Sequence, residues 1–194
     1  MTRRSAIAII GGVILLALVL WLARGGPEEA PVASDSEAST ETLEVTVDSG
    51  DLAAVAIYFP DENGLLSAEE RSLAAWTTPE GGAERVLEAL LAGPENERLF
   101  SPLPAEVTLG PVHLTPQSVL YVDLVSKTLS APPTTGSQME MMTVYSLVNT
   151  LMLAIPEIES VVLLWNGRQP PSFGGHVDTS LPLRTDRDLI RTRR

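Results

Sequence analysis

Apolar and polar positions switch between strand-like and helix-like spacing along residues 53–183. The run 53–60 (AAVAIYFP) predicts a strand that ends at the turn residues 61–64. Residues 65–76 then predict its hairpin partner, although Ser67–Glu70 would also start a helix. Apolar residues at helical spacing follow Thr78-Pro79, an N-cap with proline behind it, and Gly93-Pro94 ends this helix.

The second half of the pattern repeats this alternation. Runs 107–114 and 119–125, joined by 115–118, predict another hairpin. Ser137 and Glu140 form a capping-box pattern, and the wide apolar stripe behind them predicts a helix that ends at Pro156. The run 161–165 (VVLLW) predicts a central strand, and an extended piece around 173–183 closes the domain. We therefore expect an α+β fold in which two helices pack on a mostly antiparallel sheet in two layers.

The N-terminal run 5–23 is uncharged, apolar and long enough for a helix to cross the hydrocarbon core of a bilayer. Arg3 and Arg4 precede it, and acidic chain follows Arg24, which predicts a cytoplasmic N-terminus. A cleaved signal peptide is the alternative, but Trp21 would stand three residues before a cut at Ala23, where a small side chain is needed. We expect an uncleaved anchor in a bacterial inner (cytoplasmic) membrane, with the remaining chain extracytoplasmic or periplasmic.

This pattern divides the chain into four parts. Residues 1–24 form the transmembrane anchor, and residues 25–43, which are rich in Gly, Pro, Ser, Ala and acids, form a disordered tether. Residues 44–186 form the α+β domain. Residues 187–194 form a basic tail.

The composition excludes several classes of partner and of catalytic chemistry. The formal net charge of −12 repels phosphate backbones, so we expect no nucleic-acid partner. The chain has no cysteine, which removes thiol nucleophiles, zinc–thiolate sites and iron–sulfur clusters. Only two histidines are present, which limits acid–base chemistry near pH 7. We expect no cofactor and no metal.

The best catalytic candidates lie in the stretch 174–180 (GGHVDTS). His176 and Asp178 would share one side of a strand, where they could bind a metal or form a triad with Ser180. No cluster elsewhere suggests a third metal ligand, and Ser180 lacks the flanking glycines of a nucleophile turn. We therefore favour structural roles, with Asp178 capping a turn. We expect His113 to face solvent, and Asp123 to face solvent or to bond a backbone N–H.

Aromatic and methionine side chains at element ends are candidates for binding. Such residues anchor protein partners when exposed, or close the ends of the core when buried. Trp76 or Trp165 would also suit a platform for a cell-wall ligand. The residues at element ends or in loops are Trp76, Phe100, Met139 and Phe173.

An ordered series of short motifs resembles the GerMN domain, a sporulation and spore germination module. The resemblance covers about 55–184, and its pieces are weak singly but specific in order and spacing. They are Tyr58-Phe59 with Asp61 and Gly64-Leu65, 89–94 (ALLAGP), 101–104 (SPLP), 122–124 (VDL), 146–151 (SLVNTL), 161–167 (VVLLWNG), 174–178 (GGHVD) and Pro182-Leu183.

The resemblance implies a membrane-tethered extracytoplasmic α+β module that is akin to ring-building domains, binds other proteins and carries no established catalytic residues. The chain departs from the family pattern in having one copy of the domain and no lipoprotein cysteine. We expect a non-enzymatic envelope module that docks on an envelope protein or on itself. The alternatives are an extracytoplasmic hydrolase that uses His176 and Asp178, and a cell-wall ligand module.

Overall fold

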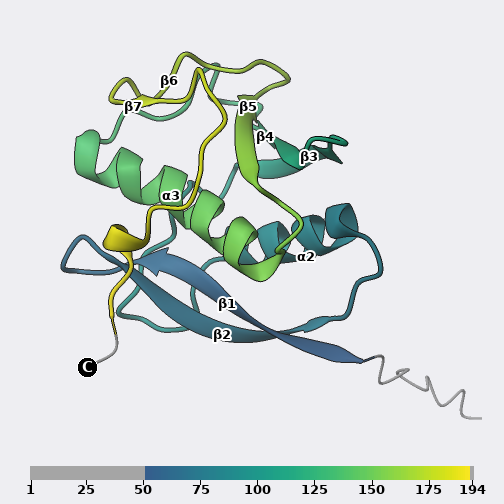
Figure 1. Ribbon diagram of the computed structural model, residues 1–194. Helices are drawn as coiled ribbons and strands as arrows, with labels where there is room; N and C mark the ends of the chain where they lie inside the picture. Colours follow the sequence, from purple (N-terminus) through teal and green to yellow (C-terminus); the bar gives the residue numbers. More distant parts are fainter. Residues whose placement is uncertain (1–50, 193–194) are drawn as a thin grey trace, which may run out of the picture. The chain divides into compact units, whose positions relative to one another are not determined.

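The computed structural model describes residues 51–192, which form two α-helices, seven β-strands and a 3-10 turn (Figure 1). The anchor 5–23 and the tether 25–43 lie outside the described residues. Within 51–192, no helix combines the length and apolarity needed to span a bilayer. The elements are β1 (Leu52–Pro60), β2 (Leu66–Ala74), α2 (Pro79–Leu91), β3 (Thr108–Leu114), β4 (Val119–Val125), α3 (Ser137–Ala154), β5 (Ser160–Trp165), β6 (Ser172–Phe173), β7 (Val177–Asp178) and η1 (Arg187–Leu189).

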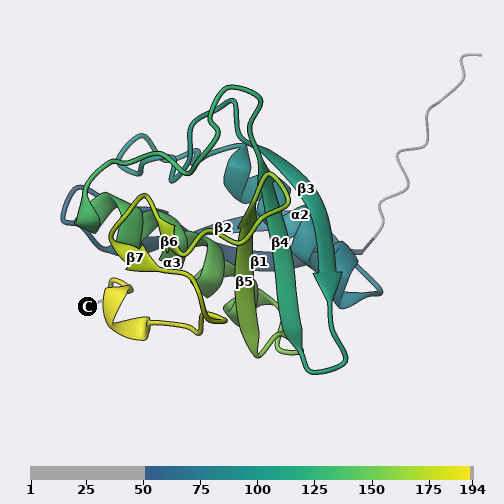
Figure 2. The same ribbon diagram turned by 90° about the horizontal axis from the view of Figure 1, so that it is seen from above.

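The helices lie between two sheets. Helix α3 contacts β1 and β5, and α2 contacts β3 and β1, so the β1–β2 hairpin covers one side and the β3-β4-β5 sheet the other (Figures 1 and 2). This mixed α/β arrangement differs from the expected two layers on one sheet. The buried side chains of both sheets and both helices still form a single hydrophobic cluster.

Helix α3 explains the extra layer, because it is buried on nearly all sides. Val144, Leu147 and Leu151 are fully buried, and so are polar residues between them. A helix with buried residues on nearly every side needs packing partners on each of those sides. The expected single stripe therefore understated its burial.

The buried polar residues of α3 hold neighbouring segments in place. Thr143 Oγ1 donates to the carbonyl of Pro102 at 2.7 Å, and Thr150 Oγ1 accepts from the N–H of Tyr58 at 3.0 Å. Asn149 exchanges two hydrogen bonds with the backbone of Asp186. Each bond satisfies a buried group that would otherwise cost free energy.

The first hairpin and the helix α2 form as the local pattern predicts. Val55, Ile57 and Phe59 alternate into the core along β1, and β2 pairs antiparallel with β1. The prediction of a strand rather than a helix at 65–76 is thus confirmed. Thr78 caps α2 through Gly81 N, and Gly93 follows the helix with φ +88°.

The second sheet departs from the prediction in its pairing. Strands β3 and β4 form the expected hairpin, but β5 pairs parallel to β4. Helix α3 supplies the crossover that a parallel pair requires. Strand β5 is the last named strand in the order β3-β4-β5, so it is not the central strand that was predicted. Its apolar run is buried because α3 packs on it and the segment at Leu183 bridges its other edge at Val161.

Candidate functional site

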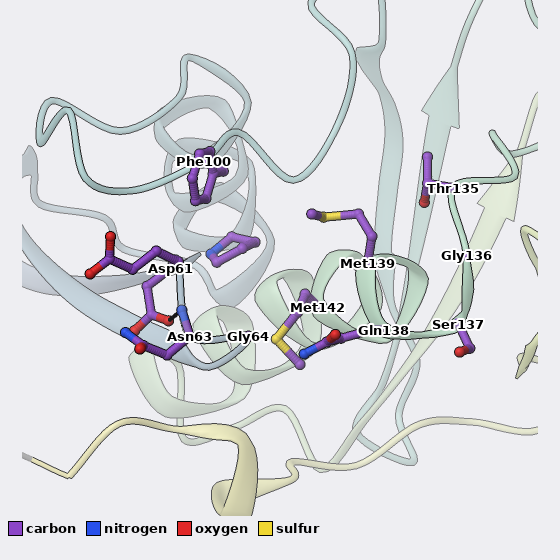
Figure 3. Close-up of a pocket in the computed structure, with 12 residues that line it drawn as sticks. Asp61, Asn63, Gly64, Phe100, Thr135, Gly136, Ser137, Gln138, Met139 and Met142 are labelled. Atoms are coloured by element: carbon purple, nitrogen blue, oxygen red, sulfur yellow. Dashed lines mark hydrogen bonds between the residues drawn. The ribbon is translucent and has the colours of Figure 1, made fainter.

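A hollow of about 720 Å³ opens between the β1–β2 turn and the first turn of α3 (Figure 3). Its two walls come from segments far apart in the chain, and Phe100 adds a third side. The lining residues are Pro60, Asp61, Glu62, Asn63, Gly64, Phe100, Thr135, Gly136, Ser137, Gln138, Met139 and Met142.

Asp61 organises the first wall. Its Oδ1 accepts from the N–H groups of Asn63 (2.8 Å) and Leu65 (3.2 Å), which shapes the turn. Its Oδ2 accepts from Ser67 Oγ at 2.8 Å and from Arg191 Nε at 2.6 Å. Burial alone would raise the pKa of Asp61, but these hydrogen bonds, led by Arg191, lower the pKa to about 2. Asp61 is therefore ionised, and both of its carboxylate oxygens accept hydrogen bonds.

Gly64 lets the turn approach the helix. Its φ is +69°, and a Cβ at this position would collide with the side-chain amide of Gln138. Any larger residue here would be strained by the positive φ, and the side chain of Gln138 would have to move aside.

Glu140 organises the second wall. Its Oε1 accepts from the N–H groups of Thr135 and Gly136, and its Oε2 accepts from the N–H and Nδ1 of His176. The side chain is fully buried. Burial opposes ionisation, but the bond to His176 and the three backbone bonds outweigh it and hold the pKa of Glu140 below its usual value.

This network corrects the predicted capping box. The N-cap is Gly136, not Ser137, and no side chain caps it. Glu140 still acts as the acidic residue of a capping box, because it accepts from the N–H of the N-cap residue Gly136. It stands one position further into the helix than that motif places it. The first turn of α3 therefore faces the hollow without a side-chain cap.

Apolar side chains occupy the rest of the hollow. Phe100 is 47% exposed and Met139 is 40% exposed, whereas Met142 is buried beneath them. In Figure 3, the side chain of Met139 extends toward the side of the hollow where Phe100 lies. Apolar groups beside uncapped backbone N–H groups suit the binding of a peptide-like ligand.

The hollow offers little for bond-breaking chemistry. Of the residues that line it, only Asp61 and Glu62 carry ionisable side chains, and hydrogen bonds occupy both oxygens of Asp61. Within residues 51–192, no group of three or more His, Cys, Asp or Glu side chains could hold a metal ion.

The predicted catalytic candidates do not assemble into a triad. His176 lies before β7, and its Nδ1 bonds Glu140 at 2.8 Å, not Asp178. Asp178 instead accepts from the N–H of Ser180 at 2.9 Å and from its hydroxyl at 2.6 Å. The prediction that Asp178 caps a turn is confirmed. A hydrolase built on His176 and Asp178 loses its geometric basis.

The other two polar candidates have structural roles. Asp123 is buried, and its Oδ1 accepts from the N–H of Gly167 at 2.9 Å, which ties β4 to the turn after β5. This is one of the two alternatives expected from the sequence. His113 is exposed on β3, as predicted.

The apolar candidates separate into two groups. Phe100 and Met139 are exposed beside the hollow. Phe173 and Trp165 are buried and pack edge to face, with ring centroids 6.0 Å apart. Trp165 also donates its Nε1 hydrogen to the carbonyl of Leu129, so it offers no platform for a ligand. Trp76 is half-buried and packs against the core.

Two contacts of the site escaped prediction. Glu140 carried a cap signal, but the sequence contained no indication that His176, 36 residues later, would share it. Arg191 belongs to the predicted basic tail 187–194, yet it pairs with Asp61, 130 residues away. Such long-range partners leave no local signature.

Comparison with known proteins places this chain in a family. The family model described as "Germane: Sporulation and spore germination" matches residues 56–170. Among curated proteins, no significant match to this chain was found.

Two solved structures share the fold. The first GerMN domain of the sporulation protein GerM from Bacillus subtilis aligns with a TM-score of 0.54 at 20% identity, over 70% of this chain and 99% of that domain. The tandem GerMN domains of the same protein align with a TM-score of 0.52 at 18% identity, over 69% of this chain. This chain spans 46% of that tandem structure. The family match covers more than half of the chain, and the chain belongs to the Germane family of sporulation and spore germination domains.

Proposed function

We propose that this chain is a non-catalytic, membrane-anchored interaction module of the cell envelope. Its hollow between the β1–β2 turn and α3 receives an apolar side chain from an envelope protein partner. The observation that carries the proposal is the pair Phe100 and Met139, which both line the 720 Å³ hollow and are 47% and 40% exposed.

The chemistry of the hollow favours a peptide segment as the ligand. An apolar side chain would fill the space between Phe100 and Met139, where large exposed side chains commonly contribute most of the binding free energy. A partner carbonyl or carboxylate oxygen would meet the uncapped first turn of α3, which carries partial positive charge.

The anchor predicted at residues 5–23 supports an envelope location. It would hold the module at a bacterial inner membrane with the body outside the cytoplasm, and the acidic residues 25–43 would serve as the connection. The resemblance to extracytoplasmic GerMN modules agrees with this topology.

Site-specific crosslinking in intact cells tests the proposal, since the natural chain has no cysteine. A Met139→Cys variant treated with a thiol-to-amine crosslinker should yield one discrete heavier adduct. Adding Phe100→Asp should reduce that adduct at least tenfold, because a carboxylate in the hollow would have to be desolvated on binding.

Leu181 provides the matched control, since it is an apolar residue 70% exposed outside the hollow. Leu181→Cys should yield no equivalent adduct, and Leu181→Asp should leave the Met139→Cys adduct unchanged. Equal adducts from both positions, or an adduct insensitive to Phe100→Asp, would contradict the proposed docking face.

A further inference from the structure

Strand β1 has one open edge within residues 51–192. It pairs with β2 alone. The carbonyl of Asp51 accepts from the N–H of Ala75 at 2.8 Å, so the odd-numbered residues of β1 face β2 and the even-numbered ones face away. On the far side, the N–H of Tyr58 donates to Thr150 of α3, which leaves the backbone of Ala54 and Ala56 toward the N-terminal end of the edge without a strand partner in this part of the chain.

A groove follows this part of the edge. It has a volume of about 330 Å³, and it lies where β1 passes the end of α3 (Figure 1). Its lining residues are Ala53, Ala54, Val55, Ala56, Tyr58, Trp76, Leu153 and Ala154. The small alanine side chains leave room for another backbone to approach.

Natural proteins rarely leave such an edge uncovered. Unpaired edge strands are usually protected by charged side chains, proline or a bulge. From Ala53 to Phe59 the strand carries no charge and no proline, and its register with β2 is unbroken. A covering strand is therefore expected.

The sequence just before β1 has the pattern of that strand. Leu43, Val45 and Val47 alternate with Glu44 and Thr46. The residues Asp48, Ser49, Gly50 and Asp51 follow, and β1 begins at the next position. Two strand patterns separated by a short segment that contains glycine are typical of a β-hairpin.

We propose that residues 43–48 pair antiparallel with the open edge of β1 through the turn 49–51. In this register Asp48 lies opposite Leu52, Thr46 opposite Ala54, and Glu44 opposite Ala56. Val47, Val45 and Leu43 then lie opposite Ala53, Val55 and Ile57, so the apolar side chains of both strands share the buried face.

The neighbouring registers fit less well. A slip of one residue would place Leu43, Val45 and Val47 on the exposed face of β1, beside Ala56, Ala54 and Leu52. A turn of only two residues would require the carbonyl of Asp51 to accept a hydrogen bond from the added strand, but that carbonyl already accepts from the N–H of Ala75.

The chain's own segment also has an advantage over a second copy of the protein. A covalently attached strand is present at an effective concentration in the millimolar range, so it occupies the edge before a separate chain does. The added strand would extend the folded body to residue 43. The connection to the anchor would then be residues 25–42.

Disulfide trapping in the full chain, purified in detergent micelles, tests this register. Thr46→Cys with Ala54→Cys places two thiols on directly opposite residues, whose Cα atoms are about 5.5 Å apart in such a pair. Mild oxidation should remove both thiols from labelling while the chain stays monomeric. In the matched control, Val45→Cys with Ala54→Cys, the side chains lie on opposite faces and both thiols should stay free.

Three results would overturn the proposal. They are free thiols in the Thr46/Ala54 pair, equal closure of the Val45/Ala54 pair, and a disulfide-linked dimer from Ala54→Cys alone, which would identify a second copy as the occupant.

Amide hydrogen exchange gives a second readout that needs no cysteine. Val45→Asp with Val47→Asp should accelerate exchange at Ala54 and Ala56 at least tenfold, and unchanged exchange would count against the added strand.

Discussion

At the scale of single residues, two buried carboxylates connect distant parts of the domain. Asp61 joins the β1–β2 turn to the C-terminal segment through Arg191. Glu140 joins the first turn of α3 to the loop before β7 through His176. Each carboxylate accepts several hydrogen bonds, which offsets the cost of burying its charge. The walls of the hollow therefore depend on ionised side chains.

The lowered pKa of Asp61 predicts a pH-dependent stability. Its pKa falls from the ordinary 3.8 to about 2 on folding. The ionised form therefore contributes about 2 kcal/mol above pH 5, and the contribution disappears as the pH falls from about 4 to below 2. In denaturant titrations, Asp61→Asn should be less stable than the natural chain by that amount at pH 7, and the two should converge near pH 2.

Asp188→Asn is the control, since Asp188 is exposed in the same C-terminal segment. It should follow the natural chain at every pH. A difference between Asp61→Asn and the natural chain that persists unchanged to pH 2 would show that the effect is not linked to ionisation.

At the scale of elements, local sequence signals predicted an element correctly where residues close in the chain supply its cap and its end. The cap Thr78, the proline behind it and the glycine after the helix all act within a few residues, and α2 begins and ends where they predict. The cap of α3 was predicted at the wrong residue, because the hydrogen bonds of Glu140 come from His176 and from Thr135 in the preceding loop.

The cap of α2 has a measurable contribution. Thr78 Oγ1 accepts from the N–H of Gly81 at 3.2 Å. Thr78→Ala should lower the free energy of unfolding by about 1 kcal/mol, the usual contribution of such a cap. The adjacent exposed Thr77 gives the comparison, and Thr77→Ala should change stability by less than about 0.5 kcal/mol. Equal losses from both variants would indicate that the cap bond is not responsible.

At the scale of the whole molecule, the two helices are enclosed between two sheets, and this arrangement creates the hollow. The β1–β2 turn and the start of α3 approach each other because α3 packs along β1. Gly64 permits that approach, and the loop that carries Phe100 closes a third side. The candidate binding surface is thus a product of layer packing rather than of any one motif.

The proposed topology predicts how the full chain fractionates. With residues 5–23 spanning a bilayer, the protein should stay in the membrane pellet after alkaline extraction, and deletion of residues 5–23 should release it to the soluble fraction. External protease should cleave the body in spheroplasts but not in intact inverted vesicles. Release of the undeleted chain by alkali, or the opposite protease pattern, would contradict the anchor.

The order of elements and the family could be recognised from sequence, because turns, caps and hydrophobic periodicity act between residues a few positions apart. Of the candidate site, the sequence indicated Phe100 and Met139 as candidates for binding, but not the hollow that they line or the contacts that build it. The parallel pairing of β5 with β4, the bond between His176 and Glu140, and the pair formed by Arg191 and Asp61 join residues between 36 and 130 positions apart. Such contacts form only when packing brings separate elements together, so the tertiary structure alone decided which side chains line the hollow and which candidates are buried.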